Sequence, residues 1–492
     1  MATPKYVGTE TEFGITVVGG EADINPVLAS SMVVSAYRRP RDVKWDHTDE
    51  HPLRDARGYE VDAHEPPADE ELGLANTVLT NGARFYVDHA HPEYSSPECS
   101  NARDLVIWDK AGERILADAA EQASRTIAGG GRVLIHKNNT DGKGAAYGTH
   151  ENYLVPRSVP FGELVRQLIP FFVSRLVYVG AGRLGNEFGL DDVPFQISQR
   201  ADFFEVEVGL ETTLKRPIIN TRDEPHSDPE KYRRLHVING DANLCEVATF
   251  LKVGTAMIVL DLIEDGAAPP VMKLHEPVAA YHRVSHDLTC RTSLRLDDGS
   301  TITPLAIQGM YLEAAKAYYK DRDIAPVTAE VLARWEAVLT TAEADPRDLR
   351  GQVDWVTKLD LLDSYRDRDG LDWSHPKLGM IDLQYHDVRL DKGLYNRLAA
   401  RGQVERLVAE SEIQSAMTKP PEDTRAYFRG RCLERFRDQI VAAGWDSLIF
   451  DVGRDALQRV PMMDPGRGTK EHVGQVLDEV DDAIELLERL QG

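Results

Sequence analysis

The sequence predicts an α+β protein in which an antiparallel sheet is packed with helices and followed by a small C-terminal domain. Segments with alternating apolar and polar residues, the pattern of half-buried strands, stand beside turn signals. Apolar residues at helical spacing occupy the segments between them. Strand pairs and helices interleave without a regular repeat, which favours antiparallel pairing with the helices on one side of the sheet.

The predicted strands lie mostly in the N-terminal half. Residues 6–18 alternate around Glu10 and Glu12, which places both carboxylates on one face of a strand. Residues 77–88 contain Asn81 and Gly82 between β-type residues, which is a hairpin pattern. Further strands are predicted at residues 132–137, 150–155, 196–208 and 444–451.

The predicted helices cover most of residues 305–370 and the ranges 102–128, 161–179, 249–263 and 471–490. Residues 38–72 are charged, contain proline and lack periodicity, so we expect a long loop inserted between structured elements. Loops of this length are uncommon in compact domains and are often functional. We predict a main domain at residues 1–425, which includes the inserted loop, and a C-terminal domain at residues 426–492.

Composition limits the class of protein. The chain has 492 residues and a formal net charge of −24, from 57 basic and 81 acidic side chains. This negative net charge argues against a protein that binds nucleic acid phosphates over its whole surface. The four cysteines lack metal or disulfide spacing, no secretory signal is evident, and no apolar run approaches the roughly 20 residues that span a bilayer. We therefore expect a cytoplasmic protein that binds neither nucleic acid nor membranes.

Acidic and aromatic side chains gather in the first strand and in the hairpin. In residues 84–88 the alternation projects three side chains to a common side, and the segment HAHPEY extends this group. Carboxylates buried on a strand face must be paired or must coordinate a cation, and Mg²⁺ that holds nucleotide phosphates prefers such oxygen ligands. An exposed edge strand with solvated acids explains the spacing equally well. The residues concerned are Glu10, Glu12, Arg84, Tyr86, Asp88, His89, His91 and Glu93.

Two further segments are rich in polar residues. Residues 136–153, HKNNTDGKGAAYGTHENY, contain a glycine-rich turn that could approach a phosphate. No GxxxxGK[ST] motif is present and no GxGxxG follows a strand, so an ordinary hairpin turn is the simpler interpretation of that segment alone. Residues 212–236 contain six basic and four acidic side chains, which suits either a phosphate clamp or a solvated ion-pair loop.

Serine and cysteine hydrolysis are poorly supported by the sequence. No GxSxG motif is present, and Cys99 has no obvious partnering histidine. A carboxylate such as Asp88 is the better candidate for a nucleophile or a base.

Four blocks taken together resemble one known family. They are GTETEFG (8–14), TNGARFYVDHAHPEYSSPEC (80–99), KNNTDGKGAAYGTHENY (137–153) and RPIINTRDEPHSDPEKYRRLHVINGDANLCE (216–246). These blocks resemble the actinobacterial family of Pup ligase and Pup deamidase/depupylase, which is related to glutamine synthetase and γ-glutamyl-cysteine synthetase. The resemblance covers most of residues 6–455 and implies a glutamine synthetase-like catalytic domain at residues 1–425.

Two features resemble the deamidase/depupylase branch of this family. The stretch WDHTDEHPLRDARGYE at residues 45–60 resembles a loop that the ligase lacks, and VDHAHPEY at residues 87–94 is one residue shorter than the ligase segment. Pup ligase is the alternative. A Pup- or nucleotide-binding regulator without catalytic activity is a third possibility, against which the intact set of acidic residues argues.

The resemblance implies a hydrolase that acts at the γ-carbonyl of the C-terminal residue of Pup, a small disordered protein tag of the proteasome pathway. The terminal Gln would be deamidated to Glu, and the isopeptide bond between Pup and a substrate lysine would be cut. ATP and Mg²⁺ are the implied cofactors, and Pup and pupylated proteins are the implied partners.

The resemblance also implies roles for single residues. Asp88 matches the catalytic aspartate, either a nucleophile or a general base. The implied magnesium ligands are Glu10, Tyr86 and Glu93, with Glu12 and His150 as further candidates, and the implied nucleotide contacts are Arg84, Ser96 and Trp445. We add Arg222 as a candidate for stabilising negative charge on the carbonyl oxygen.

Two expectations concern recognition. Because Pup is acidic and the chain carries a net charge of −24, we expect a local basic groove that draws on residues 215–234. The inserted loop is interpreted either as a disordered surface excursion or as a gate over the active site, whose LRDARG segment would reach a phosphate or carboxylate.

Overall fold

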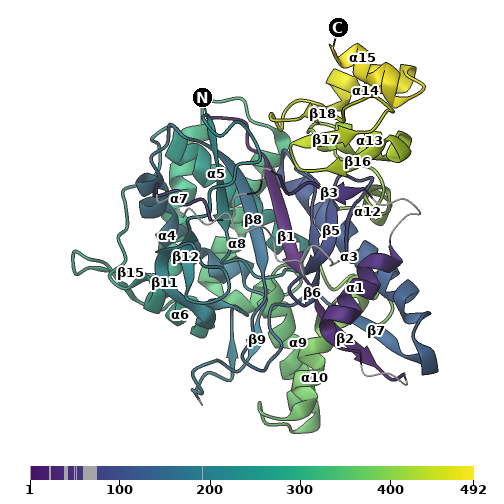
Figure 1. Ribbon diagram of the computed structural model, residues 1–492. Helices are drawn as coiled ribbons and strands as arrows, with labels where there is room; N and C mark the ends of the chain where they lie inside the picture. Colours follow the sequence, from purple (N-terminus) through teal and green to yellow (C-terminus); the bar gives the residue numbers. More distant parts are fainter. Residues whose placement is uncertain are drawn as a thin grey trace.

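A computed structural model describes residues 2–20, 24–37, 43–48, 50, 53–58, 75–190 and 192–491. At its centre is a six-stranded sheet in which every pair of neighbouring strands is antiparallel, as the alternation predicts (Figure 1). The N-terminal strand β1 occupies an inner position, between β8 and β6. In spatial order the strands are β13 (Tyr232–Val237), β8 (Thr149–Pro156), β1 (Val7–Glu12), β6 (His91–Ser95), β5 (Arg84–Asp88) and β4 (Asn76–Val78).

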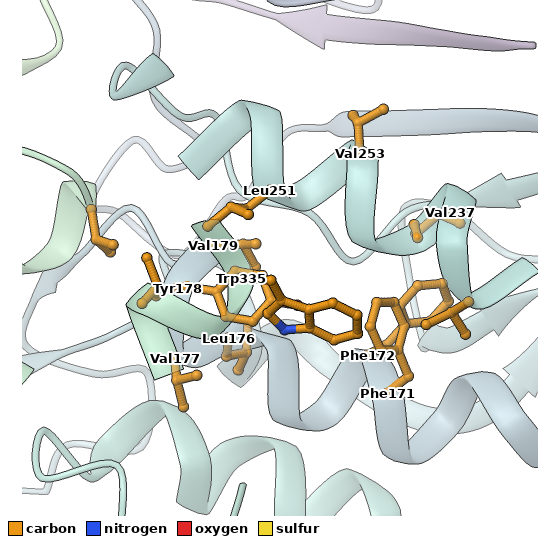
Figure 2. Packing of buried hydrophobic residues seen from close by; sticks show 14 of the residues in the cluster. Phe171, Phe172, Leu176, Val177, Tyr178, Val179, Val237, Leu251, Val253 and Trp335 are labelled. Carbon is orange, nitrogen blue, oxygen red and sulfur yellow. The ribbon is translucent and has the colours of Figure 1, made fainter. Parts of the chain in front are cut away.

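Helices pack against one face of this sheet. Val7 of β1 and Val237 of β13 belong to the same apolar cluster as the buried residues of α4 and α5. Figure 2 shows part of this cluster, in which the ring of Trp335 approaches Phe171 and Phe172 of α4. The Phe171 and Trp335 ring centroids lie 6.4 Å apart at 79°, an edge-to-face arrangement.

The helices and minor strands complete the α+β fold. The helices are α1 (Pro26–Ala36), α3 (Ala102–Ser124), α4 (Phe161–Val179), α5 (Glu246–Glu264), α6 (Pro277–His286), α7 (Pro304–Tyr319), α8 (Pro326–Ala344), α9 (Asp354–Asp369), α10 (Pro376–Tyr385), α11 (Leu394–Ala400), α12 (Glu410–Ala416), α13 (Ala426–Arg435), α14 (Lys470–Glu479) and α15 (Ala483–Gln491). Two-stranded pairs are formed by β2 (Gly14–Val18) with β7 (Arg132–His136), β9 (Arg183–Leu184) with β10 (Phe195–Gln196), β11 (Phe204–Gly209) with β12 (Arg216–Asn220), and β14 (Leu294–Arg295) with β15 (Thr301–Ile302).

The strand predicted at residues 6–18 is divided at Phe13. The Phe13 amide donates to the carbonyl of Pro92, and β2 then leaves the central sheet to pair with β7. Glycine is required at the next position, because a Cβ on Gly14 would lie 2.5 Å from both Asn138 Oδ1 and the Tyr147 hydroxyl. Alternation continues across the break, so the sequence pattern does not reveal it.

The helix predicted at residues 471–490 is also divided. Val480 is extended (φ −85°, ψ 145°) and buried, and α15 begins after it. The Glu485 amide donates to Asp482 Oδ1 at 2.9 Å, so Asp482 caps the second helix. Two consecutive aspartates are a capping signal that the apolar spacing alone conceals.

The C-terminal residues build a second sheet, with strand order β18-β17-β16-β3. It contains β16 (Ile440–Ala443), β17 (Ser447–Phe450) and β18 (Gln458–Pro461), together with β3 (Lys44–Trp45) from the predicted inserted loop. One apolar cluster joins this sheet to residues of α13, α14 and α15 and also includes Val43, Trp45 and Val78. The boundary at residue 425 stays a prediction.

Two expectations from composition can be compared with the structure. All four cysteines are free and buried, as their spacing predicts. Within the described residues, no helix combines the length and the apolar character needed to cross a membrane.

A buried ion-pair triad joins the central sheet to the C-terminal residues. Arg425 Nε donates to Glu98 Oε1 at 2.7 Å, and Arg429 Nη2 donates to Glu98 Oε2 at 2.5 Å. Burial alone would raise the pKa of Glu98, but the charges and hydrogen bonds of the two arginines lower it to about 2. Arg429 is fully buried, so a lost partner would leave a buried charge uncompensated.

We expect Glu98→Gln to lower the free energy of unfolding by about 3 kcal/mol, as measured by urea denaturation at neutral pH. The pKa of Glu98 in the folded protein lies below its ordinary value of 4.5. Ionised Glu98 therefore makes its full contribution to the free energy of unfolding above about pH 4.5. The difference in free energy of unfolding between the parent protein and Glu98→Gln should therefore become smaller as the pH falls from about 4.5 toward 2.

Glu422→Gln is the matched control for this prediction. Glu422 pairs with Lys470 at 2.8 Å, and both side chains are more than half exposed. Such a pair contributes less than about 1 kcal/mol. Equal destabilisation by the two substitutions would contradict the role given to the triad.

Candidate active site

The candidate site lies on the face of the central sheet opposite the helices. In β1 every second residue is buried in the core, whereas Glu10 and Glu12 lie half-buried on the other face. In β5 the half-buried residues are Arg84, Tyr86 and Asp88. Both shared faces agree with the alternation in the sequence.

Strand register brings these side chains together across four strands. Glu93 of β6 stands opposite Glu12 of β1 and opposite Tyr86 of β5. On the other side of β1, Glu10 stands opposite His150 of β8. Directly opposed residues of antiparallel strands have Cβ atoms about 5 Å apart, so the register creates a continuous polar patch.

Glu12, Asp88 and Glu93 form a group of three carboxylates, with one oxygen from each within 4.8 Å of the others. Burial, followed by the negative charges of the neighbouring acids, raises the pKa of Glu93 well above its ordinary value. Three carboxylates this close are all ionised only when a cation lies among them. Their oxygens are the ligands that Mg²⁺ prefers, so the donor set fits a magnesium ion.

Tyr86 borders the carboxylate group and stands directly opposite Glu93 in the strand register. Burial and the negative charge of Glu93 raise the pKa of Tyr86 well above 10, so its phenol is neutral. The structure therefore brings together Glu12, Tyr86 and Glu93, three of the five residues predicted as magnesium ligands.

The other two predicted ligands belong to a neighbouring group, in which Glu10, His150 and His236 lie within 4.8 Å of one another. His150 Nδ1 is 3.3 Å from Glu10 Oε2, and Asn152 donates to Glu10 Oε1 at 2.8 Å. Although burial opposes it, the hydrogen bond with His150 and the positive charge of Arg234 hold the pKa of Glu10 well below its ordinary value. The carboxylate is therefore ionised.

Sequence reasoning missed His236 and Arg234. Both lie in β13, which pairs with β8 and so reaches β1 through an intervening strand. Arg234 Nη1 donates to Asn152 at 2.9 Å and is 3.5 Å from Glu10 Oε1. The alternation within YRRLHV places both side chains on one face, but nothing local identifies the strand beside them.

Asp88 is the last residue of β5, at the tip of the β5–β6 hairpin. Its side chain is 40% exposed and 3.1 Å from His89 Nδ1. Burial of the carboxyl would raise its pKa, but the interaction with His89 holds the pKa of Asp88 below its ordinary value. An ionised and accessible carboxylate at the edge of the carboxylate group is suited to act as a nucleophile or a base.

An open cavity adjoins the second group, and Glu10 and Arg234 are part of its lining. Its lining combines the backbone of β1 with basic and aromatic side chains, so it suits an anionic ligand with a flat ring. The lining includes Gly8, Thr9, Glu10, Ser95, Ser96, Asn152, His226, Arg234, Arg425 and Trp445.

Two of the three predicted nucleotide contacts line this cavity, namely Ser96 and Trp445. The Ser96 hydroxyl accepts from the Thr9 amide at 3.0 Å, which fixes the first residues after β6 against β1. The third, Arg84, does not line the cavity, but it stands opposite Ser95, which does. The structure thus places Arg84 at the border between the cavity and the carboxylate group.

The described part of the inserted loop is attached to the site. The Ala56 amide donates to the Thr221 carbonyl at 2.7 Å, and the Asp223 amide donates to the Arg54 carbonyl at 2.9 Å. The Thr221 hydroxyl also donates to Asp55 Oδ2 at 2.8 Å. Residues 53–58 are therefore not a detached surface excursion. The predicted gate stays a prediction, and residues 38–42, 49, 51–52 and 59–72 of the loop lie outside the described residues.

Arg222 lies in the segment that this loop contacts. Its Nε is buried without a hydrogen-bond partner, and no other described residue accepts a hydrogen bond from its side chain. Burial and then Arg234 lower the pKa of His236 well below its ordinary value, and Arg222 adds to this effect. The guanidinium therefore lies near the second group and is available to an added negative charge.

The basic groove expected from residues 215–234 stays a prediction, and the basic side chains of this segment lie in different environments. Arg216 and Arg233 are buried, and Lys231 is exposed but pairs with Asp228 at 2.9 Å. Arg234 is 11% exposed and contacts acidic side chains of the site. Arg234 is thus paired with acids of the site, whereas Arg216 donates to the backbone carbonyls of Thr212 and Ala146.

Known proteins resemble the chain along its whole length. It is 56% identical to a protein named depupylase from Acidothermus cellulolyticus and 52% identical to a Pup deamidase/depupylase from Mycobacterium tuberculosis, over 99% of both chains in each case. The Pup ligase PafA, solved in complex with Pup, superposes with a TM-score of 0.81 at 34% identity and covers 96% of this chain and 91% of its own. PafA solved in complex with ADP gives a TM-score of 0.74 at 37% identity, covering 82% and 89%.

The family model described as Pup-ligase protein matches residues 5–449, which include every residue discussed at the site. The antiparallel sheet, the carboxylate-rich patch and the full-length identity agree with this match. The chain therefore belongs to the Pup-ligase protein family.

Proposed function

We propose that the chain is an ATP- and Mg²⁺-dependent hydrolase that deamidates the C-terminal Gln of Pup to Glu and cuts the isopeptide bond between Pup and substrate lysines. The observation that carries this proposal is the full-length identity of 56% and 52% to proteins named for depupylation, against 38% to 42% to proteins named Pup ligase. Its partners would be Pup and pupylated proteins, and its location the cytoplasm.

The carboxylate group supports the choice of metal. Glu12 and Glu93, with Tyr86 beside them and Glu10 and His150 in the adjoining group, would hold Mg²⁺. Magnesium bound there would neutralise phosphate charge and polarise an oxygen ligand. The residues themselves supply negative charge at fixed positions, because strand pairing restrains each of their backbones.

The cavity supports the choice of nucleotide. Ser96 and Trp445 line it and would contact ATP there, and Arg84 would reach the phosphates from the border between cavity and carboxylate group. Arg234 and Arg425 also line the cavity, where their guanidinium donors would contact phosphate oxygens in addition to their acidic partners.

Asp88 and Arg222 would act on the substrate carbonyl. The Asp88 carboxylate is ionised, partly exposed and at a hairpin tip, so it can attack the carbonyl carbon or take a proton from water. Arg222, whose side chain has no hydrogen-bond partner among the described residues, would stabilise the negative charge that develops on the carbonyl oxygen.

A mass-shift assay tests the proposed reaction. Incubation of the purified protein with ATP, Mg²⁺ and glutamine-ended Pup should exchange the terminal amide NH₂ for OH, which mass spectrometry detects, and should release ammonia. A Pup ligase would instead join glutamate-ended Pup to lysine and consume ATP in proportion. That outcome would replace the hydrolase proposal, and an unchanged mass in both assays would indicate a binding protein.

Asp88→Asn should reduce deamidation and depupylation together by about 10³-fold or more, because one carboxylate serves both reactions. The fold should be retained, since the side chain is 40% exposed. Asp391→Asn, which alters an exposed aspartate paired with Lys392, is the matched control and should keep full rates. Comparable activity in the two variants would remove Asp88 from the chemistry.

Glu93→Gln should weaken Mg²⁺ binding by at least about tenfold, a loss that even outer-shell substitutions cause. The raised pKa of Glu93 means that its carboxyl keeps a proton above its ordinary pKa until a cation displaces that proton. Affinity for Mg²⁺ should therefore rise with pH in the parent protein, with proton release that the variant lacks.

Calorimetric titration of Mg²⁺ in two buffers of different ionisation enthalpy measures this release. Glu121→Gln, an exposed glutamate paired with Arg125, is the control. Proton release that persists in Glu93→Gln would show that another group takes up the metal-linked proton.

A further inference from the structure

The inserted loop brings one tryptophan to the border of the cavity. Strand β3 pairs in parallel with β16, so that Trp45 stands beside Ala443 in the C-terminal sheet. The Asp46 amide donates to the Ala443 carbonyl at 3.0 Å, and Asp46 Oδ2 pairs with Arg459 at 2.7 Å. Trp45 is 7% exposed. The strand pairing and the contacts of Asp46 hold its backbone against β16.

Trp45 contacts two of the three residues proposed to bind the nucleotide. Its ring lies 5.1 Å from that of Trp445 at an angle of 71°, an edge-to-face contact. The Arg84 guanidinium carbon lies 4.2 Å from the centroid of the Trp45 ring, well within cation–π range. Trp45 does not line the cavity, so it acts on the cavity through these two neighbours.

Arg84 is restrained from several directions. Its guanidinium carbon lies 3.9 Å from the Tyr86 ring, and its Nε donates to Asn76 Oδ1 at 3.3 Å. Its Nη1 lies 3.8 Å from Glu50 Oε1, the oxygen that also accepts the Trp45 Nε1 hydrogen bond at 2.7 Å. Two residues of the inserted loop, Trp45 and Glu50, therefore act together with Asn76 and Tyr86 to restrain the guanidinium.

We propose that Trp45 is a positioning residue of the nucleotide site, which holds the Arg84 guanidinium toward the phosphates. The inference deepens the proposed function and rests on it. An arginine has many rotamers, and one that is already restrained loses less freedom when a phosphate binds. The inserted loop thereby contributes to nucleotide affinity without touching the nucleotide.

The competing explanation is that Trp45 only fills the apolar cluster of the C-terminal sheet, to which it belongs. The two explanations differ in what the side chain must provide. A core role needs apolar volume, whereas the positioning role needs an aromatic face for Arg84.

Trp45→Phe and Trp45→Leu separate these explanations, because both keep apolar volume and only Phe keeps a ring. Calorimetric titration of the full chain with ADP and Mg²⁺ gives the Kd, and thermal unfolding gives the Tm. We expect the Leu variant to bind ADP about fivefold more weakly and the Phe variant to stay within about twofold of the parent. Both variants should lower the Tm, and Trp45→Met replaces Trp45→Leu if the latter does not fold.

Lys44→Ala is the matched control, since Lys44 is exposed on the same strand. Its Kd should equal that of the parent. Trp45→Leu should also add little to the loss caused by Arg84→Lys, because the two residues act through one contact. Deamidation at saturating ATP should remain within about twofold of the parent rate in the Leu variant, because a positioning role changes binding rather than chemistry.

Three outcomes would overturn the proposal: an unchanged Kd in Trp45→Leu, equally weak binding by the Phe and Leu variants, or full additivity with Arg84→Lys. Failure of the parent protein to bind ADP would overturn the nucleotide site itself. These results are distinguishable, because the first three require a parent that binds ADP.

Discussion

The arrangement of the site depends on one constraint, the close approach of carboxylates across the inner strands of the sheet. Glu10 and Glu12 project from β1 toward strands that carry further polar residues, and the register admits no other neighbours. Burying ionised carboxylates without partners is unfavourable by several kcal/mol each. In the group around Glu10, histidines and Arg234 are the partners of the carboxylate. The group of Glu12, Asp88 and Glu93 consists of carboxylates alone, and the repulsion among them contributes to the raised pKa of Glu93. A cation is the simplest partner that such a group can have.

The same alternation in β1 supports both the fold and the site. The residues that alternate with the glutamates are buried, and Val7 among them belongs to the apolar cluster, so a shift of register by one residue would exchange core and site. Part of the cavity lining comes from residues far from β1 in the sequence. Trp445, for example, lies between β16 and β17. The Glu98 triad connects the segment after β6 to α13, and Glu98 and Arg425 both line the cavity. Stability and ligand binding therefore share residues at this junction.

Local patterns allowed the sheet, the hairpin and the shared faces of β1 and β5 to be predicted, because alternation depends only on neighbouring residues. The register that places His236 near Glu10 depends on which strands pair, and no feature of a single sequence encodes it. In the same way, a count of charges does not reveal that Arg216 and Arg233 are buried. Asp482 was a signal that the last helix divides, because aspartate commonly caps a helix. The continuous apolar spacing nevertheless favoured one helix.

The arginines around the site differ in how their charges are paired. Arg234 is shared among Glu10, Glu224 and Asn152, and Arg84 is held by Glu50 and two aromatic rings. Their positive charges are already compensated by fixed partners. Arg222 differs, because in the described part of the chain its side chain makes no hydrogen bond, while the inserted loop fixes its backbone through the residues on either side. A restrained arginine with free donors can stabilise a charge that appears only during the reaction, whereas a paired arginine must first give up its partner.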